Sequence, residues 1–184
     1  MAYLTASDGD RGNRLIVNTE MATLAGETYE AEITFDDPDA ADVGIAFAVQ
    51  PTTTGWSDFT GYLAFVHTGR GEIRLDRWAN GSQIESVREP VSLTAGQPLT
   101  ATIGFRDPED VLTFKLADGP HSASEATLDD DTHDWGLLGF YRFHYGPNWR
   151  ISHVTLVEEE EPEPKTAHEL LLEAAAKIVS VGPD

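Results

Sequence analysis

The 184-residue chain contains no cysteine. Disulfide bonds, thiolate metal ligands and cysteine nucleophiles are therefore excluded together. Long apolar runs are also absent, and none approaches the ~20 residues that a membrane-spanning helix requires. Charged residues such as Asp8, Asp10, Arg11 and Arg14 stand where a secretory signal needs an apolar centre. The sequence thus predicts no export signal and no membrane insertion, which is consistent with synthesis in the cytoplasm.

Positive charge is scarce. Only 12 Lys and Arg oppose 32 Asp and Glu, giving a net charge of -20, and the lysines are Lys115, Lys165 and Lys177. This imbalance argues against nucleic acid as a partner, because phosphate would be repelled. Such usage is typical of a salt-adapted, halophilic source, where ions screen self-repulsion. An acidic surface kept for solubility is the alternative interpretation.

Short alternating segments fill the first 157 residues. In Thr28–Phe35, every second residue is apolar from Tyr29 onward, which predicts a strand with one solvated face. Asp42–Gln50 repeats the pattern after a turn-forming run of Asp and Pro. We therefore expect these two segments to pair as a hairpin.

Two further hairpins are predicted from their turns. Gly61–His67 and Glu72–Trp78 flank Gly69-Arg70-Gly71, and Asn80-Gly81 marks the next turn. More strands fit the following segments: Gln83–Leu93, Leu99–Phe105, Val111–Leu116, Gly136–Tyr145 and Arg150–Val157. No strand is followed by a helical crossover, so the expected fold is all-β: a two-layer antiparallel sandwich of the jelly-roll type, spanning residues 1–157.

The last part of the chain has a different character. Residues 158–165 are rich in Glu and Pro, which predicts an extended acidic linker. Residues 166–181 begin with a capping-box spacing and favour one amphipathic α-helix. Its apolar stripe includes Leu170, Leu171, Ala174 and Ile178. This stripe either packs back on the sandwich or binds a protein partner or a second copy of the chain, and the acidic linker favours the second interpretation.

The segment Gly61–Gly81 resembles the central hairpin of laminin-G-like and levan-binding modules, in which a Gly-Tyr strand, a short turn and an "x-Arg-Leu-x-Arg" strand follow one another. The resemblance continues through later segments: Val91–Gly96, Leu112–Gly119, Gly136–Phe140 and Trp149–Leu156. It implies a concanavalin A-like jelly roll, a fold that often binds glycans and sometimes calcium. Such a fold hosts many activities, so the resemblance specifies architecture better than function.

Catalytic patterns are missing from the sequence. Glycosidases of this fold place acidic residues at i, i+2 and i+5 on one strand, and neither Glu30 with Glu32 nor the other acidic pairs reproduce that triplet. No zinc-protease, nucleophile-elbow or phosphate-loop motif is present. We therefore expect no enzyme activity, and glycoside hydrolysis is the disfavoured alternative. Calcium remains an open alternative to a cofactor-free protein, through Asp36, Asp37, Asp39 and Asp42 or through Asp129–Asp131 with Asp134.

Aromatic rings beside polar side chains suit sugars, since a ring stacks on the apolar sugar face while polar groups receive the hydroxyls. The candidate ligand-binding residues are Trp56, Tyr62, Arg74, Trp78, Arg142, Tyr145 and Trp149, among which Trp56 and the loop ending at Trp149 stand out. The predicted function is a non-catalytic carbohydrate-binding or adhesion module, with a glycan or cell-surface polysaccharide as partner. The alternative is a structural component of a virus or phage particle, anchored through the C-terminal helix after assembly into the virion.

Overall fold

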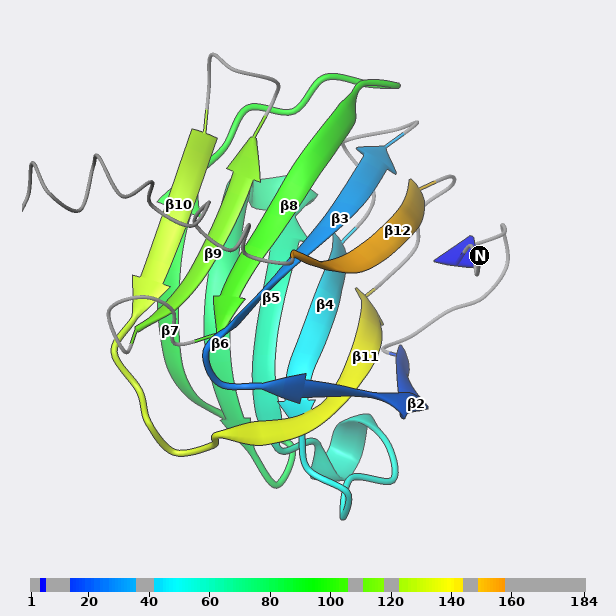
Figure 1. Cartoon of the computed structure of the whole chain (residues 1–184). Coiled ribbons are helices and arrows are strands. Elements are labelled where there is room, and N and C mark those ends of the chain that lie inside the picture. Colours follow the sequence, from blue (N-terminus) through cyan, green and yellow to red (C-terminus); the bar gives the residue numbers. More distant parts are fainter. Residues whose placement is uncertain are drawn as a thin grey trace, which may run out of the picture.

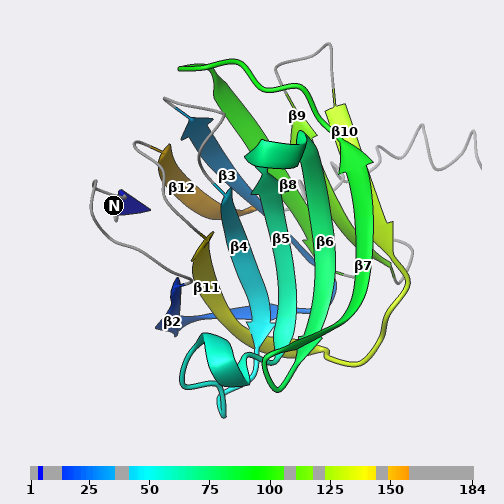
Figure 2. The same cartoon turned by 180° about the vertical axis from the view of Figure 1, so that it is seen from behind.

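The computed structural model describes residues 4–5, 14–35, 42–105, 111–117, 123–143 and 149–157. Two six-stranded sheets, in which every strand pairing is antiparallel, pack face to face (Figures 1 and 2). Sheet A has the order β1 (Leu4–Thr5), β12 (Trp149–Val157), β3 (Glu27–Phe35), β8 (Pro98–Phe105), β9 (Leu112–Ala117), β10 (Ala123–Leu128). Sheet B has the order β2 (Arg14–Leu24), β11 (Trp135–Phe143), β4 (Asp42–Val49), β5 (Gly61–His67), β6 (Glu72–Ala79), β7 (Ser82–Pro90).

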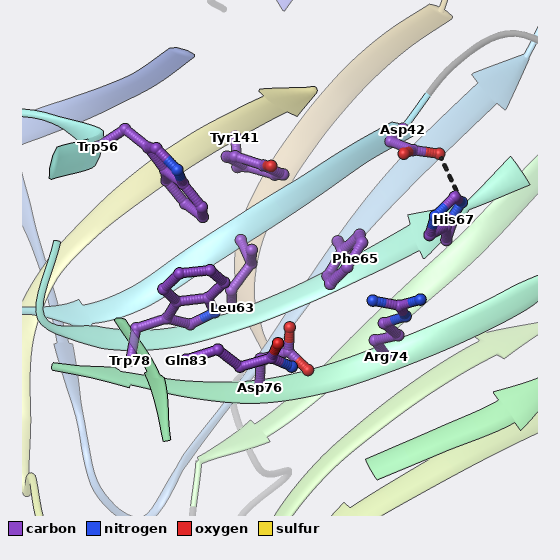
Figure 3. A pocket seen from close by; sticks show the side chains of 10 residues that line it. All are labelled: Asp42, Trp56, Leu63, Phe65, His67, Arg74, Asp76, Trp78, Gln83 and Tyr141. Carbon is purple, nitrogen blue, oxygen red and sulfur yellow. Dashed lines mark ion pairs between the residues drawn. The ribbon is translucent and has the colours of Figure 1, made fainter. Parts of the chain in front are cut away.

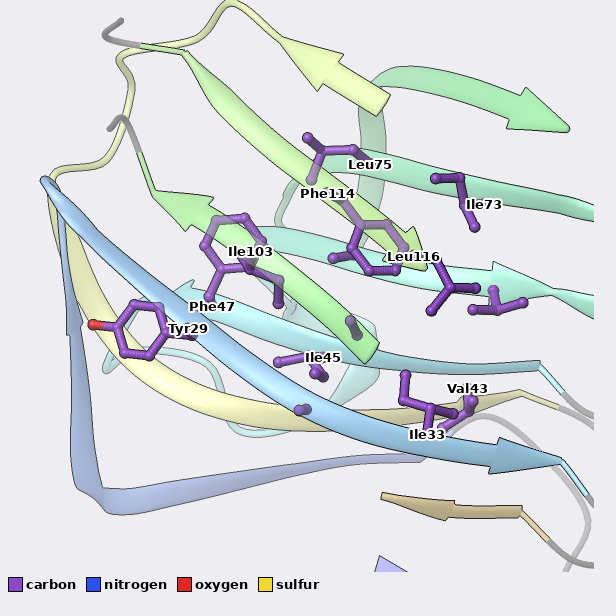
Figure 4. Packing of buried hydrophobic residues seen from close by; sticks show 14 of the residues in the cluster. Tyr29, Ile33, Val43, Ile45, Phe47, Ile73, Leu75, Ile103, Phe114 and Leu116 are labelled. Carbon is purple, nitrogen blue, oxygen red and sulfur yellow. The ribbon is translucent and has the colours of Figure 1, made fainter. Parts of the chain in front are cut away.

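The core lies between the two sheets. Alternate residues of β3, Tyr29 to Phe35, point inward from sheet A, as their spacing predicts, and each is at most 3% exposed. Sheet B contributes Ile45 and Phe47 from β4 (Figure 4). The Phe47 ring meets Phe105 edge-on at 5.5 Å. Burial of these apolar faces is the main favourable term holding the sheets together.

The two hairpins predicted from their turns are confirmed. β5 and β6 pair from Gly61 opposite Trp78 to His67 opposite Glu72, around the 3-10 turn η2 (Thr68–Arg70). Between β6 and β7, Asn80 and Gly81 both have positive φ, at 49° and 71°. Two successive left-handed residues are the signature of the tight turn that matches the twist of paired strands.

The expected pairing of residues 28–35 with 42–50 is wrong. β3 pairs with β8 and β12 in sheet A, whereas β4 pairs with β5 and β11 in sheet B. Both strands have an apolar side, and alternation shows only which side is buried. Ile33 of β3 and Ile45 of β4 belong to one core cluster because the strands face each other across the sandwich.

A β-bulge near the end of β4 moves a side chain to the other face of sheet B. Ala48 has φ 48°, and the β4–β11 register shifts beside it. Its N–H binds the Thr23 hydroxyl at 2.8 Å, so the irregular backbone keeps a partner. Beyond the bulge, Val49 joins Ala46 on the face turned away from the core. A bulge re-aims side chains in this way.

The predicted linker and helix, including the stripe of Leu170, Leu171, Ala174 and Ile178, lie outside the described residues. Within the described ranges the helical elements are two 3-10 turns, η1 (Trp56–Asp58) and η2. No helix there has the length and hydropathy needed to cross a membrane.

Two isoleucines of the β6–β7 hairpin test which of its side chains face the core and which face solvent. Ile73 is fully buried in the core, whereas Ile84 is 50% exposed. Ile73→Ala should lower the free energy of unfolding by about 2–5 kcal/mol, because it leaves a cavity. Ile84→Ala, the matched control, should change it by less than about 1 kcal/mol. Urea denaturation measures both, and equal losses would show that the faces are assigned incorrectly.

Candidate functional site

A pocket of about 210 Å³ lies on the face of sheet B turned away from the core (Figure 3). Because strand side chains alternate, Tyr62, Ala64 and Val66 of β5 face the core while the residues between them face the pocket. The register of β6 adds a second row opposite them. The lining residues are Asp42, Trp56, Leu63, Phe65, His67, Arg74, Asp76, Trp78, Gln83 and Tyr141.

Rings form one end of the pocket. The Trp56 ring stacks on Tyr141 at 4.4 Å between centroids and lies 4.5 Å from the Trp78 ring. Trp56 also stacks on Phe59 at 5.5 Å. Tyr141 and Leu63 are buried, whereas the two tryptophans are half-buried. Part of each indole thus remains open to a ligand.

The η1 turn brings Trp56 over the sheet. The Asp58 carboxylate accepts hydrogen bonds from the N–H groups of Thr54 and Gly55 at 3.0 and 2.9 Å and from the Thr54 hydroxyl at 2.6 Å. The Thr54 hydroxyl, followed by these N–H groups, lowers the pKa of Asp58. The turn also packs on the β6–β7 hairpin, since a Cβ at Gly81 would stand 2.1 Å from the Ser57 carbonyl oxygen. Glycine at that position permits the contact.

The opposite end of the pocket is polar. Asp42 accepts a hydrogen bond from the Thr68 N–H at 3.0 Å, and its Oδ1 lies 3.2 Å from Nδ1 of His67. Burial lowers the pKa of His67, with Arg74 and Arg70 adding to the effect and Asp42 opposing it. His67 therefore offers a neutral imidazole at neutral pH, which can donate through one nitrogen and accept through the other.

Arg74 lies between the two ends. Its guanidinium carbon is 5.4 Å from the Phe65 ring centroid, within the range of a cation–π contact. Its Nε donates to Oε1 of Glu72 at 2.6 Å, and its Nη2 forms an ion pair with the same oxygen. Figure 3 shows Arg74 on β6 beside Phe65. The contacts with Glu72 and Phe65 hold the planar guanidinium in one place.

Asp76 is a carboxyl group under the pocket and is 1% exposed. Burial raises the pKa of Asp76, while Ser86, Arg74 and Gln83 oppose the shift without cancelling it. A buried carboxylate is costly unless it is hydrogen-bonded. Asp76 therefore ties the pocket floor to Ser86 and Gln83 of the neighbouring strand β7.

Three of the predicted ligand-binding residues, Trp56, Arg74 and Trp78, come together in the pocket. Tyr62 and Trp149 lie in the core instead, 0% and 5% exposed. The Tyr62 hydroxyl donates to Asp130 at 2.6 Å, and Arg77 pairs with the same carboxylate at 2.8 Å. These two rings are therefore structural.

The side chain of Arg142 and the whole of Tyr145 lie outside the described residues. The sequence reasoning missed His67, Phe65 and Gln83 as site residues, and it gave Asp42 only as a candidate calcium ligand. A usable signal existed for two of them. The turn at 69–71 fixes the hairpin register, which sets Phe65 opposite Arg74 and places His67 two residues further along the same face.

Metal binding finds no support among the described residues, where no three His, Asp or Glu side chains gather as ligands. In the second predicted cluster, Asp130 is occupied by Tyr62, Arg77 and the Thr132 N–H. In the first cluster, Asp36, Asp37 and Asp39 lie outside the described ranges. Calcium binding stays an untested alternative.

No protein-family model and no curated protein matches the chain. Solved structures do match its fold. Carbohydrate-binding module CBM66 from Bacillus subtilis is 15% identical over 85% of this chain and 95% of its own, with a TM-score of 0.63. A legume lectin-like domain from Entamoeba histolytica is 11% identical over 86% and 84%, with a TM-score of 0.62. Congerin II bound to lactose and MES is 15% identical over 78% and 99%, with a TM-score of 0.53. The two-layer jelly-roll fold expected from the sequence is thereby confirmed.

The buried carboxyl group of Asp76 predicts a pH dependence of stability. A raised pKa means that the folded protein binds this proton more tightly than the unfolded chain does. The tighter binding of this proton stabilises the fold when the pH is below 3.8, the ordinary pKa of an aspartic acid. That stabilisation is lost as the pH rises through the pKa of Asp76 in the folded protein. The Asp76→Asn variant should consequently gain stability relative to the wild type as the pH rises from about 3.5 to 7.

Asp58→Asn is the control of opposite sign, because the pKa of Asp58 is lowered. Compared with Asp58→Asn, the wild type should gain stability as the pH rises through the pKa that Asp58 has in the folded protein. Urea denaturation of the three proteins from about pH 2 to 7 measures both trends, because the change at Asp58 falls below its ordinary pKa of 3.8 and that at Asp76 falls above it. Parallel trends for the two variants would contradict the burial assigned to Asp76.

Proposed function

We propose that this chain is a non-catalytic carbohydrate-binding module that holds a sugar on the outer face of sheet B. The observation that carries the proposal is the composition of the pocket: partly open Trp56 and Trp78 rings adjoin the polar groups of His67, Arg74 and Gln83. The apolar face of a sugar ring stacks on an indole while fixed polar groups bind its hydroxyls.

The size of the pocket supports a small ligand unit. Its volume of about 210 Å³ is below the ~300–1,000 Å³ typical of sites for drug-sized molecules. One sugar ring, with the rest of a chain outside the pocket, fits such a volume. The similar structures agree with this interpretation, since one is a carbohydrate-binding module and another carries lactose.

The pocket carboxyl groups argue against glycoside hydrolysis. That reaction needs one carboxylic acid that protonates the glycosidic oxygen and a second carboxylate across the bond. Asp42 is held by His67 and the Thr68 N–H, and Asp76 is 1% exposed. Asp42 is thus engaged by its neighbours, and the Asp76 carboxyl group is closed off from solvent. Binding without cleavage is the function that this arrangement supports.

The virion alternative depends on the helix expected over residues 166–181, which lies outside the described residues. It stays a prediction, as does a partner or second copy bound through that helix. Neither conflicts with sugar binding, because a particle component that grips a surface glycan would do both.

Trp56→Ala tests the proposed function. Removing the indole should weaken binding of whichever glycan the wild type prefers on a glycan array by at least tenfold, or about 1.4 kcal/mol. Trp135→Ala is the matched control, because Trp135 is 51% exposed and lies outside the pocket. That variant should bind as the wild type does. Isothermal titration gives the affinities, and circular dichroism confirms folding.

Two results would contradict the proposal. The wild type could bind no glycan on the array although it is folded, or Trp56→Ala and Trp135→Ala could weaken binding equally. Trp149→Ala is a third variant, and it tests the structural role of a core ring. Its ring belongs to the core, so this variant should lose about 3–5 kcal/mol of folding stability.

A further inference from the structure

Arg74 is a cation inside the pocket, yet its charge is already engaged. Two of its nitrogens, Nε and Nη2, face the single oxygen Oε1 of Glu72. The Arg74 side chain is 10% exposed and that of Glu72 is 18% exposed, so water screens this pair weakly. Arg70 approaches the same oxygen at 4.0 Å from the solvent side. Glu72 is thus flanked by both arginines.

The charged groups around the pocket leave no excess of positive charge for an anion. Asp42, Asp76 and Arg74 line the pocket, Glu72 pairs with Arg74, and Arg70 lies 4.0 Å from the same Glu72 oxygen. His67 is held neutral by burial, which lowers its pKa. With Asp76 protonated, the carboxylates of Asp42 and Glu72 balance the guanidinium groups of Arg74 and Arg70. The chain as a whole carries a net charge of -20, so its long-range field repels anions.

We infer that the pocket binds sugars whose ring substituents are uncharged and rejects acid sugars, and that Glu72 sets this preference by occupying Arg74. The inference rests on the proposed function and names the ligand class of the same site. An incoming carboxylate has to displace Glu72 from Arg74 or lie beside it unpaired. Either outcome leaves a partly buried negative charge without its partner, which is costly. A hydroxyl needs no such exchange.

The wild type tests the ligand class directly. The probes are methyl glycosides of glucose, galactose and mannose, each compared with the uronide in which C6 of the same ring is a carboxylate. Isothermal titration at one fixed ionic strength should show at least tenfold weaker binding of each uronide than of its neutral partner, or about 1.4 kcal/mol. Equal or tighter binding of the uronides would overturn the inference.

Glu72→Gln tests the assigned residue. The amide keeps the shape of the side chain but no longer neutralises Arg74, so the ratio of uronide to neutral affinity should rise about tenfold. Glu125→Gln is the matched control: it removes the same charge from an exposed position on β10 of the other sheet. In Glu125→Gln, the ratio of uronide to neutral affinity should stay within about twofold of the wild-type value. Equal shifts in both variants would overturn the role of Glu72.

The two proposals fail in different ways. If the protein binds neither the neutral nor the acidic glycosides and binds no glycan on the array, the proposed function is overturned, and the inference with it. Binding of uronides as tightly as neutral sugars overturns the inference alone. If Glu72→Gln does not fold by circular dichroism, the wild-type comparison still decides the ligand class.

Discussion

The β5–β6 hairpin pairs its strands in a register on which both the core and the pocket depend. One face of the hairpin places Tyr62 and Ile73 against sheet A, and the other presents Phe65 and Arg74 to the pocket. Because side chains alternate with a period of two, a slip of one residue in either strand would exchange these faces. Rings would then enter solvent and charges would enter the core. The cost of that exchange fixes the register, and the left-handed Gly71 at the turn reinforces it.

Charge is arranged locally so that an acidic chain can keep a partly buried polar pocket. Arg74 pairs with Glu72, and Asp42 lies beside His67, so the two carboxylates at the polar end have partners. Burial moves the pKa of Asp76 upward and that of His67 downward, in each case toward the neutral form. The result is a site with several hydrogen-bonding groups and a single engaged cation, placed beside an aromatic surface. These properties suit a neutral polyhydroxylated ligand better than an anion.

Local patterns predicted most of the strands, although not β1, β2 or β10, and turn residues predicted two hairpins, because both signals depend on neighbours in the sequence. Strand partners further along the chain were not predictable in this way: β3 and β4 look like a hairpin yet belong to opposite sheets. The same limit separates Trp56 from Trp149. Both follow loop-like sequences, but the η1 turn folds Trp56 over sheet B, whereas pairing of β12 with β3 turns Trp149 into the core. Only the tertiary arrangement decides which ring is open to a ligand.

The four tryptophans allow the central claim, that the outer face of sheet B is where sugar binds, to be tested in one experiment. Each indole N–H gives its own cross-peak in a proton–nitrogen correlation spectrum, and titration with a bound sugar shifts the peaks nearest to it. Trp56 and Trp78 line the pocket, Trp135 is exposed elsewhere and Trp149 is in the core. We expect the Trp56 and Trp78 peaks to shift together in a saturable way, while the other two stay in place. A saturable shift confined to Trp135 or Trp149 would contradict the claim and place the sugar elsewhere on the molecule.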